Sequence, residues 1–248
     1  MFRVFLRAFL TTSLPLLFLV FSAGRTSAQN LLTNGDFENI GTITLNNGYA
    51  AVGSGGLIPG WTTVAGTAAN ANVYVATANS GATWIPNPQS GTYSIQLDST
   101  SNDALQTSSS ISQTLKVTSG QSYLLSFWFN TEVKANLTSI IQTTLSGAFS
   151  STNTYSTTAS SAVTQGNAVW VHVTETFTAT RNGNLTILFS DISTSDSNAS
   201  LDNVSLTLVP EPVTCIAGAF ALGLVGWRVR SRRSARAAVT SPPDLPRD

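Results

Sequence analysis

The sequence predicts an all-β fold for the middle of the chain, an antiparallel β-sandwich spanning residues 29–209. This region is rich in Thr, Ser, Val, Ile and aromatic residues, and Gly and Asn interrupt it at intervals. No stretch keeps a 3.6-residue apolar period, whereas several alternate apolar and polar residues, which is typical of strands with one buried face. Many such strands in one domain imply two sheets packed face to face.

Composition limits the classes of partner and the sources of stability. Charged residues make up 10% of the 248 residues, against roughly 25% in ordinary soluble proteins. Residues 29–209 hold nine acidic and only three basic residues, for a net charge of −6. Such a surface cannot neutralise a phosphate backbone, so we expect no nucleic acid partner. The single cysteine, Cys215, lies outside this region, which therefore has no internal disulfide.

Residues 1–28 have the pattern of a secretory signal peptide. Two arginines within the first seven residues precede an apolar stretch at 8–21, and small residues at 26–28 suit cleavage. We expect Gln29 to be the mature N-terminus, with the Sec machinery and signal peptidase as transient partners. The alternative, an uncleaved anchor, needs a longer run, because a spanning helix takes about 20 residues.

Several segments of the body alternate clearly enough to predict strands, and two turn signals join pairs of them. Asn182-Gly183 predicts a tight hairpin between two of the segments, and Ser119-Gly120 predicts another. Residues 146–167 are rich in Ser and Thr and are interpreted as a long loop with room for one irregular strand; 39–60 is also loop-like. The predicted strands are 93–97, 111–117, 123–129, 169–177, 185–189 and 204–208.

Three features follow one another near the C-terminus. Pro210-Glu211-Pro212 precedes an apolar run at 213–227, and arginines follow. The run would form about 22 Å of helix, which is short for a hydrocarbon core of roughly 30 Å. The arginines favour a cytoplasmic C-terminal side, with the body outside the membrane. The arginines are Arg228, Arg230, Arg232 and Arg233.

This segment resembles the PEP-CTERM sorting signal of Gram-negative bacteria. The resemblance implies a sorting segment at 210–233, a membrane helix at 213–229 and a cytoplasmic, disordered tail at 234–248. It also implies recognition by an exosortase-type enzyme, transient residence in the inner membrane, and a final place at the cell surface or in an exopolysaccharide and biofilm matrix. The alternative is a plain C-terminal anchor that is never processed.

The body is similar to galactose-binding-like jelly-roll domains, and in particular to the DUF642 or choice-of-anchor C group. The similarity covers essentially all of the body through short motifs and implies a jelly-roll sandwich that binds carbohydrate. The matching segments are 30–38 (Asn-Leu-Leu-Thr-Asn-Gly-Asp-Phe-Glu), Pro59-Gly60-Trp61, 89–97, 111–115, 120–123 and 200–206.

Asp36, Glu38 and Asp202 are candidate ligands for a structural calcium ion. In related jelly rolls the first and last strands are neighbours, and acids there hold calcium, which takes six to eight oxygen ligands. A bound metal ion would help to stabilise a body that has no disulfides. The alternative is local turn chemistry, because Asp and Asn beside Gly commonly bond their own backbone.

Five residues are candidates for stacking on, or hydrogen bonding to, a sugar: Trp84, Trp61, Tyr74, Tyr93 and Asn87. Trp84 is the foremost of them, because its Gly- and Pro-containing surroundings indicate a loop. Trp61 has an alternative place in the core, since aromatic residues dominate core burial. Trp128 and Trp170 are assigned to structure.

No pattern indicates an enzyme. His172 is the only histidine and has no nucleophile motif beside it, and a glycosidase would need two acids such as Glu132 and Glu175 across one cleft. The sequence therefore predicts an exported, non-enzymatic protein that binds extracellular polysaccharide. The alternative is a structural or adhesive surface protein that contacts proteins or itself and has no sugar site.

Overall fold

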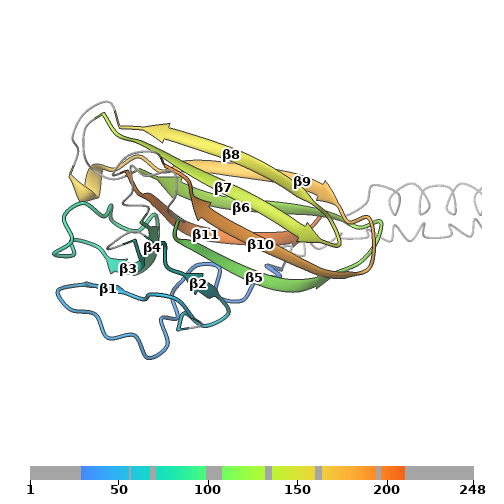
Figure 1. Cartoon of the computed structure of the whole chain (residues 1–248), viewed down its shortest axis with the longest axis horizontal. Helices are drawn as coiled ribbons and strands as arrows, with labels where there is room; N and C mark the ends of the chain where they lie inside the picture. Colours follow the sequence, from blue (N-terminus) through green and yellow to red (C-terminus); the bar gives the residue numbers. More distant parts are fainter. Residues whose placement is uncertain are drawn as a thin grey trace, which may run out of the picture.

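The described part of the chain forms two antiparallel sheets packed as a sandwich (Figure 1). The computed structural model describes residues 29–55, 57–67, 71–98, 108–131, 136–159, 164–193 and 197–209. The predicted signal peptide and the predicted sorting segment and tail lie outside these ranges. Within the ranges, none of the structure is a helix with the length and apolarity needed to cross a membrane.

Each sheet takes strands from distant parts of the chain. The six-stranded sheet has the order β1 (Tyr49–Ala51), β3 (Val73–Thr77), β4 (Tyr93–Leu97), β11 (Ala199–Leu208), β6 (Ser122–Asn130) and β9 (Val171–Thr178). The five-stranded sheet has the order β2 (Thr62–Val64), β5 (Ser110–Val117), β10 (Gly183–Asp191), β7 (Thr138–Gly147) and β8 (Ser151–Thr158). A short 3-10 helix, η1 (Gln165–Asn167), precedes β9.

The core lies between the sheets and follows the predicted alternation. In β6 the apolar residues at every second position are buried, as are their counterparts in β10. Phe127 of β6 meets Phe189 of β10 edge to face, with ring centroids 5.0 Å apart. The period-2 pattern thus identified the inward faces correctly, and the prediction of an all-β sandwich is confirmed.

Both predicted hairpins are wrong. β5 lies in one sheet and β6 in the other, and the same holds for β10 and β9. The turns at Ser119-Gly120 and Asn182-Gly183 instead carry the chain across from sheet to sheet, and they bond to each other. The Ser119 amide donates to Asn182 Oδ1 at 2.8 Å, and the Gly120 amide donates to the Ala179 carbonyl at 2.9 Å. A turn signal marks a reversal of the chain, but the strand's partner is chosen by burial of its apolar face.

The expected long loop at 146–167 contains a regular strand. β8 pairs with β7 over eight consecutive residues without a bulge. Its sequence, Ser-Thr-Asn-Thr-Tyr-Ser-Thr-Thr, is polar on both faces, and only Tyr155 packs against the core. An edge strand of this kind gives no apolar alternation, so its pairing with β7, rather than a pattern of its own, reveals it.

Candidate functional site

Residues 30–38 run along β11, and we call this segment the N-terminal strap. The Asn30 side chain bonds β11 twice: Nδ2 donates to the Val204 carbonyl at 3.0 Å, and Oδ1 accepts from the Leu206 amide at 2.9 Å. The Val204 amide, within a β-bulge of β11, donates to the Gly35 carbonyl at 2.7 Å. The family-like motif at 30–38 therefore has a structural task, which is to hold the first segment of the domain on its last strand.

An open cleft of about 530 Å³ lies between the N-terminal strap and the outer face of β6 and β11. Its volume falls within the roughly 300–1,000 Å³ of small-molecule sites. Trp128 is the tryptophan among the described residues that line this cleft, which we call the Trp128 cleft. The polar side chains that line it are Asn30, Asn34, Asp36, Ser126, Asn203 and Ser205.

The Trp128 ring is held in place by a histidine. Trp128 on β6 faces His172 on β9, and their rings stack with centroids 4.6 Å apart and planes 22° apart. The imidazole Nε2 lies 2.7 Å from the Ser126 hydroxyl, so a hydrogen bond fixes its orientation. The sequence interpretation missed this site because it assigned Trp128 to structure. The available signal was its place on the polar face of β6, in line with Ser122 and Ser126 rather than with the phenylalanines.

Two of the predicted calcium ligands accept hydrogen bonds from backbone amides. Glu38 Oε1 accepts from the Thr92 and Tyr93 amides at 2.8 and 3.1 Å. Asp202 Oδ2 accepts from the amides of residues 89 and 90 at 2.9 and 3.2 Å, and its Oδ1 accepts from the Asn203 amide at 2.7 Å. The two carboxylates therefore hold the segment 89–93 against the strap and β11.

Asp202 is fully buried, and this changes its acidity. Burial raises the pKa of Asp202 from 3.8 to about 7, and the negative charge of Glu38 adds to the rise. The three amide donors act in the opposite direction, because they stabilise the ionised form. Burial outweighs them, so this carboxylate titrates near neutral pH.

The third predicted calcium ligand, Asp36, is exposed, and its carboxylate accepts from the Glu38 amide at 3.5 Å. Nowhere in the described ranges do three or more His, Cys, Asp or Glu residues gather as a metal-binding group. Calcium stays a prediction. A thermal melt with and without chelator tests it, since a lower Tm in chelator supports it and an unchanged Tm contradicts it.

Trp61 is a core residue, which corrects its assignment to a sugar site. Its side chain is 2% exposed, and its Nε1 donates to the Asn34 carbonyl at 2.9 Å. Its ring packs against Phe37 and Phe189 at centroid distances of 5.4 and 6.4 Å. No face of the indole remains for a ligand, and the alternative weighed above is the correct one.

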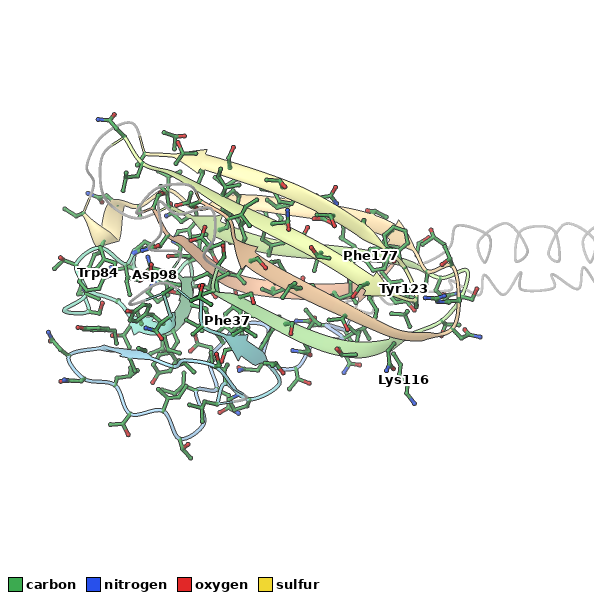
Figure 2. All side chains as sticks on the ribbon, in the orientation of Figure 1. Phe37, Trp84, Asp98, Lys116, Tyr123 and Phe177 are labelled. Carbon is green, nitrogen blue, oxygen red and sulfur yellow. The ribbon has the colours of Figure 1, made fainter. Side chains whose placement is uncertain are left out.

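Trp84 lies at the end of the sandwich opposite the end that carries Lys116 (Figure 2). Trp84 and Tyr74 are half-buried and join Tyr49 around a small apolar cluster of Ala76, Ala82 and Ile85, and we call this group the loop cluster. Tyr93 is half-buried and packs on the main core. Asn87 holds its loop: its carbonyl accepts from Trp170 Nε1 at 3.1 Å, and its amide oxygen accepts from the Asn79 amide at 2.7 Å. The structure thus gathers Trp84 with Tyr74, and neither residue lines the Trp128 cleft.

Glu175 is engaged in a contact between the sheets. From β9 it accepts from the hydroxyls of Thr143 on β7 and Tyr155 on β8, both at 2.6 Å, and from the Asn153 amide at 3.0 Å. Burial, followed by the bond to Glu175, raises the pKa of Tyr155 above its ordinary value. Glu132 lies outside the described residues.

Solved structures are similar to this chain at low sequence identity. A cyclase from Fischerella sp. TAU is 15% identical with a TM-score of 0.54, and the match covers 72% of this chain and 96% of that one. TmCBM61, solved in complex with β-1,4-galactotriose, is 17% identical with a TM-score of 0.44, covering 73% and 100%. The bacteriophage CBA120 tailspike protein 4 active domain is 18% identical with a TM-score of 0.45, and the match spans 73% of this chain but only 21% of the tailspike chain.

Comparison by sequence gives a family. No curated protein matches the chain. The family described as "Protein of unknown function (DUF642)" matches residues 30–206, which include the N-terminal strap, β1 to β10, most of β11 and the described residues that line the Trp128 cleft. The match covers well over half of the 248 residues. The chain therefore belongs to the DUF642 family.

Proposed function

We propose that this protein is a non-enzymatic jelly-roll domain that binds neutral polysaccharide in the Trp128 cleft. The observation that carries the proposal is the lining of that cleft, in which an indole braced by a stacked imidazole lies among five amide and hydroxyl side chains. Sugar rings stack their C–H faces on such indoles, while amides and hydroxyls bond the ring hydroxyls. An apolar platform with several uncharged polar groups fits this chemistry better than it fits an apolar ligand.

Charge narrows the ligand further. Among the described residues that line the cleft, Asp36 is the only charged one, and none is a lysine or arginine. A polymer with uronate, sulfate or phosphate groups would meet a like charge without a cationic partner. Neutral chains are therefore favoured over acidic ones.

We infer that the protein meets this polysaccharide outside the cell. The support is the sequence alone: a signal-like segment at 1–28 and the Pro210-Glu211-Pro212 segment with its apolar run and arginines. On this proposal Sec and signal peptidase act first, the inner membrane holds the chain transiently, and an exosortase-type enzyme releases it to the cell surface or biofilm matrix. N-terminal sequencing that begins at Met1, or mass spectrometry that finds 228–248 on the surface protein, contradicts it.

Binding is tested on a broad glycan array with the purified protein, with and without calcium. Trp128→Ala removes the proposed platform, and we expect binding to neutral glycans to fall by at least tenfold. Trp84→Ala is the matched control, because it removes an indole from the loop cluster and leaves the Trp128 cleft intact. Loss of glycan binding with Trp84→Ala but not with Trp128→Ala would place the sugar site at the loop cluster. Binding of no glycan by the unchanged protein would favour a structural or adhesive surface protein.

A further inference from the structure

Four buried side chains on the outer face of the six-stranded sheet carry polar atoms without hydrogen-bond partners. They are the hydroxyls of Ser94 and Ser200, both polar ends of the Gln96 amide, and the Asn130 Nδ2 group. Ser94, Gln96 and Ser200 are 0% exposed and Asn130 is 2% exposed. Buried polar groups in native proteins nearly always have partners, so four orphans in one place need an explanation.

The strand register joins these residues into one group. Ser200 on β11 lies opposite Gln96 on β4 and also opposite Asn130 on β6. Tyr74 on β3, itself a predicted sugar-binding residue, lies opposite Gln96 on the other side. We call Tyr74, Gln96, Ser200 and Asn130 the polar row. Ser94 precedes Gln96 by two positions in β4 and shares its face.

A second buried glutamine, Gln113, has a structural role and serves as a comparison for Gln96. Gln113 on β5 is 8% exposed, and its amide bonds Thr33 in both directions: Oε1 accepts from the Thr33 amide at 2.7 Å, and Nε2 donates to the Thr33 carbonyl at 2.9 Å. Gln96 is more deeply buried and has neither bond. An unsatisfied buried amide lowers stability, whereas a satisfied one raises it. Gln96 therefore reduces the stability of the fold, which is the usual cost of a functional group.

The polar row lies one step along the strands from the Trp128 cleft. Trp128 and Asn130 are two positions apart on the same face of β6, which places them about 7 Å apart along the strand. Asp202, opposite Trp128, occupies the corresponding position two residues after Ser200. Between the indole and the orphan amides, Asp202 holds the backbone of residues 89 and 90 on this face of the sheet.

The chemistry of the orphans specifies their partner. A carboxamide presents one acceptor and one donor side by side, which matches two adjacent hydroxyls of a sugar ring. The hydroxyl of Ser200 and the Nδ2 of Asn130 add a donor-acceptor and a donor in the same line. None of these groups is charged, and the acids nearest in sequence, Asp98 and Asp202, oppose an anion.

We propose that the polar row is an inner subsite for one sugar unit of a neutral polysaccharide, next to the Trp128 cleft. This rests on the proposed function. Gln96, Ser200 and Asn130 are at most 2% exposed, so the sugar unit reaches them only when segment 89–90 moves off Asp202, and the Gln96 amide then bonds adjacent hydroxyls. The subsite makes the protein selective for chains with unsubstituted vicinal hydroxyls.

The test compares Gln96→Leu with Gln113→Leu in the full chain, by thermal melting and by binding to soluble neutral glucan, galactan and mannan oligosaccharides. Gln96→Leu is expected to keep or raise Tm by a few degrees while weakening binding about tenfold, because it removes an unsatisfied amide and a ligand partner together. Gln113→Leu is expected to lower Tm and leave the affinity of the folded protein unchanged. Ser200→Ala, a smaller change in the same row, is likewise expected to weaken binding without lowering Tm.

A direct readout accompanies these variants. In ¹⁵N-labelled protein, oligosaccharide is expected to shift the side-chain NH₂ signals of Gln96 and not those of Gln113. If Trp128→Ala abolishes binding while Gln96→Leu and Ser200→Ala bind like the unchanged protein, the subsite is wrong and the cleft stands. A lower Tm in Gln96→Leu with normal binding shows a purely structural row and also overturns the subsite. Absence of binding by the unchanged protein overturns both proposals.

Discussion

Gly35 of the N-terminal strap lies directly against the main-chain carbonyl of Val204 in β11. A Cβ atom at position 35 would stand well inside 3.0 Å of that oxygen, a distance that real Cβ atoms essentially never reach. The approach lets the Gly35 carbonyl accept from the Val204 amide within the bulge. The Asn-Gly-Asp sequence at 34–36 is thus a packing requirement between the two ends of the domain.

Gly35→Ala is expected to destabilise the domain by about 2–4 kcal/mol, because backbone on both sides must shift to accept a methyl group. Chemical denaturation measures the free energy of unfolding. Gly166→Ala in η1 is the control, since a Cβ there meets only the Asn87 side-chain amide at 3.5 Å. Equal effects from the two substitutions would contradict the close approach.

The buried Asp202 carboxyl is expected to make stability fall as pH rises from about 4 to about 7. Its pKa rises from 3.8 to about 7 on folding, so the folded chain holds a proton that the unfolded chain has already released, and raising the pH favours unfolding. The contribution is fully present below about pH 4 and is lost by about pH 7.

Asp202→Asn isolates this effect from that of the other acids. The variant mimics the protonated carboxyl at every pH, so its stability relative to the unchanged protein should increase as the pH rises from about 4 to about 7. Thermal melts of both proteins from pH 4 to pH 8 measure the difference. An opposite trend would mean that the amide bonds from residues 89, 90 and 203 outweigh burial.

Tyr155→Phe is expected to lower stability by about 1–2 kcal/mol, because it leaves Glu175 with one fewer hydroxyl donor between the sheets. The raised pKa of Tyr155 gives a second readout, because it ionises above the ordinary tyrosine range in an absorbance titration. Burial also raises the pKa of Tyr74, so Tyr155→Phe is expected to reduce the late absorbance change and leave the part that belongs to Tyr74. Tyr49→Phe is the control, since Tyr49 packs by its ring in the loop cluster.

Sequence patterns predict the inward faces of this fold well and its strand partners poorly. The phenylalanines of β6 and β10 alternate with polar residues, and that alternation alone identifies the core. The turns at 119–120 and 182–183 look like hairpins, yet each crosses between sheets, because pairing depends on distant strands that a local pattern does not contain.

The site was predicted less well, for a physical reason. Trp61 was expected in a sugar site but is buried, whereas Trp128 was assigned to structure but lines the cleft. Both indoles lie in aromatic, strand-rich sequence, and only the packing of the sheets decides which face is covered. Gln96 and Gln113 are the same residue type, yet only the Gln113 amide has hydrogen-bond partners. A sequence pattern does not distinguish the two.

The position of β11 has a consequence for how the domain acquires its structure. It is the last strand of the described chain, yet it lies inside the six-stranded sheet between β4 and β6, and the N-terminal strap bonds to it. Until residues 199–208 are synthesised, β4 and β6 have no strand between them, and the N-terminal strap lacks the strand to which it bonds. Contacts between such distant segments make folding slow. The chain therefore remains without its native sheet while it is being made, and it closes only when its final strand arrives.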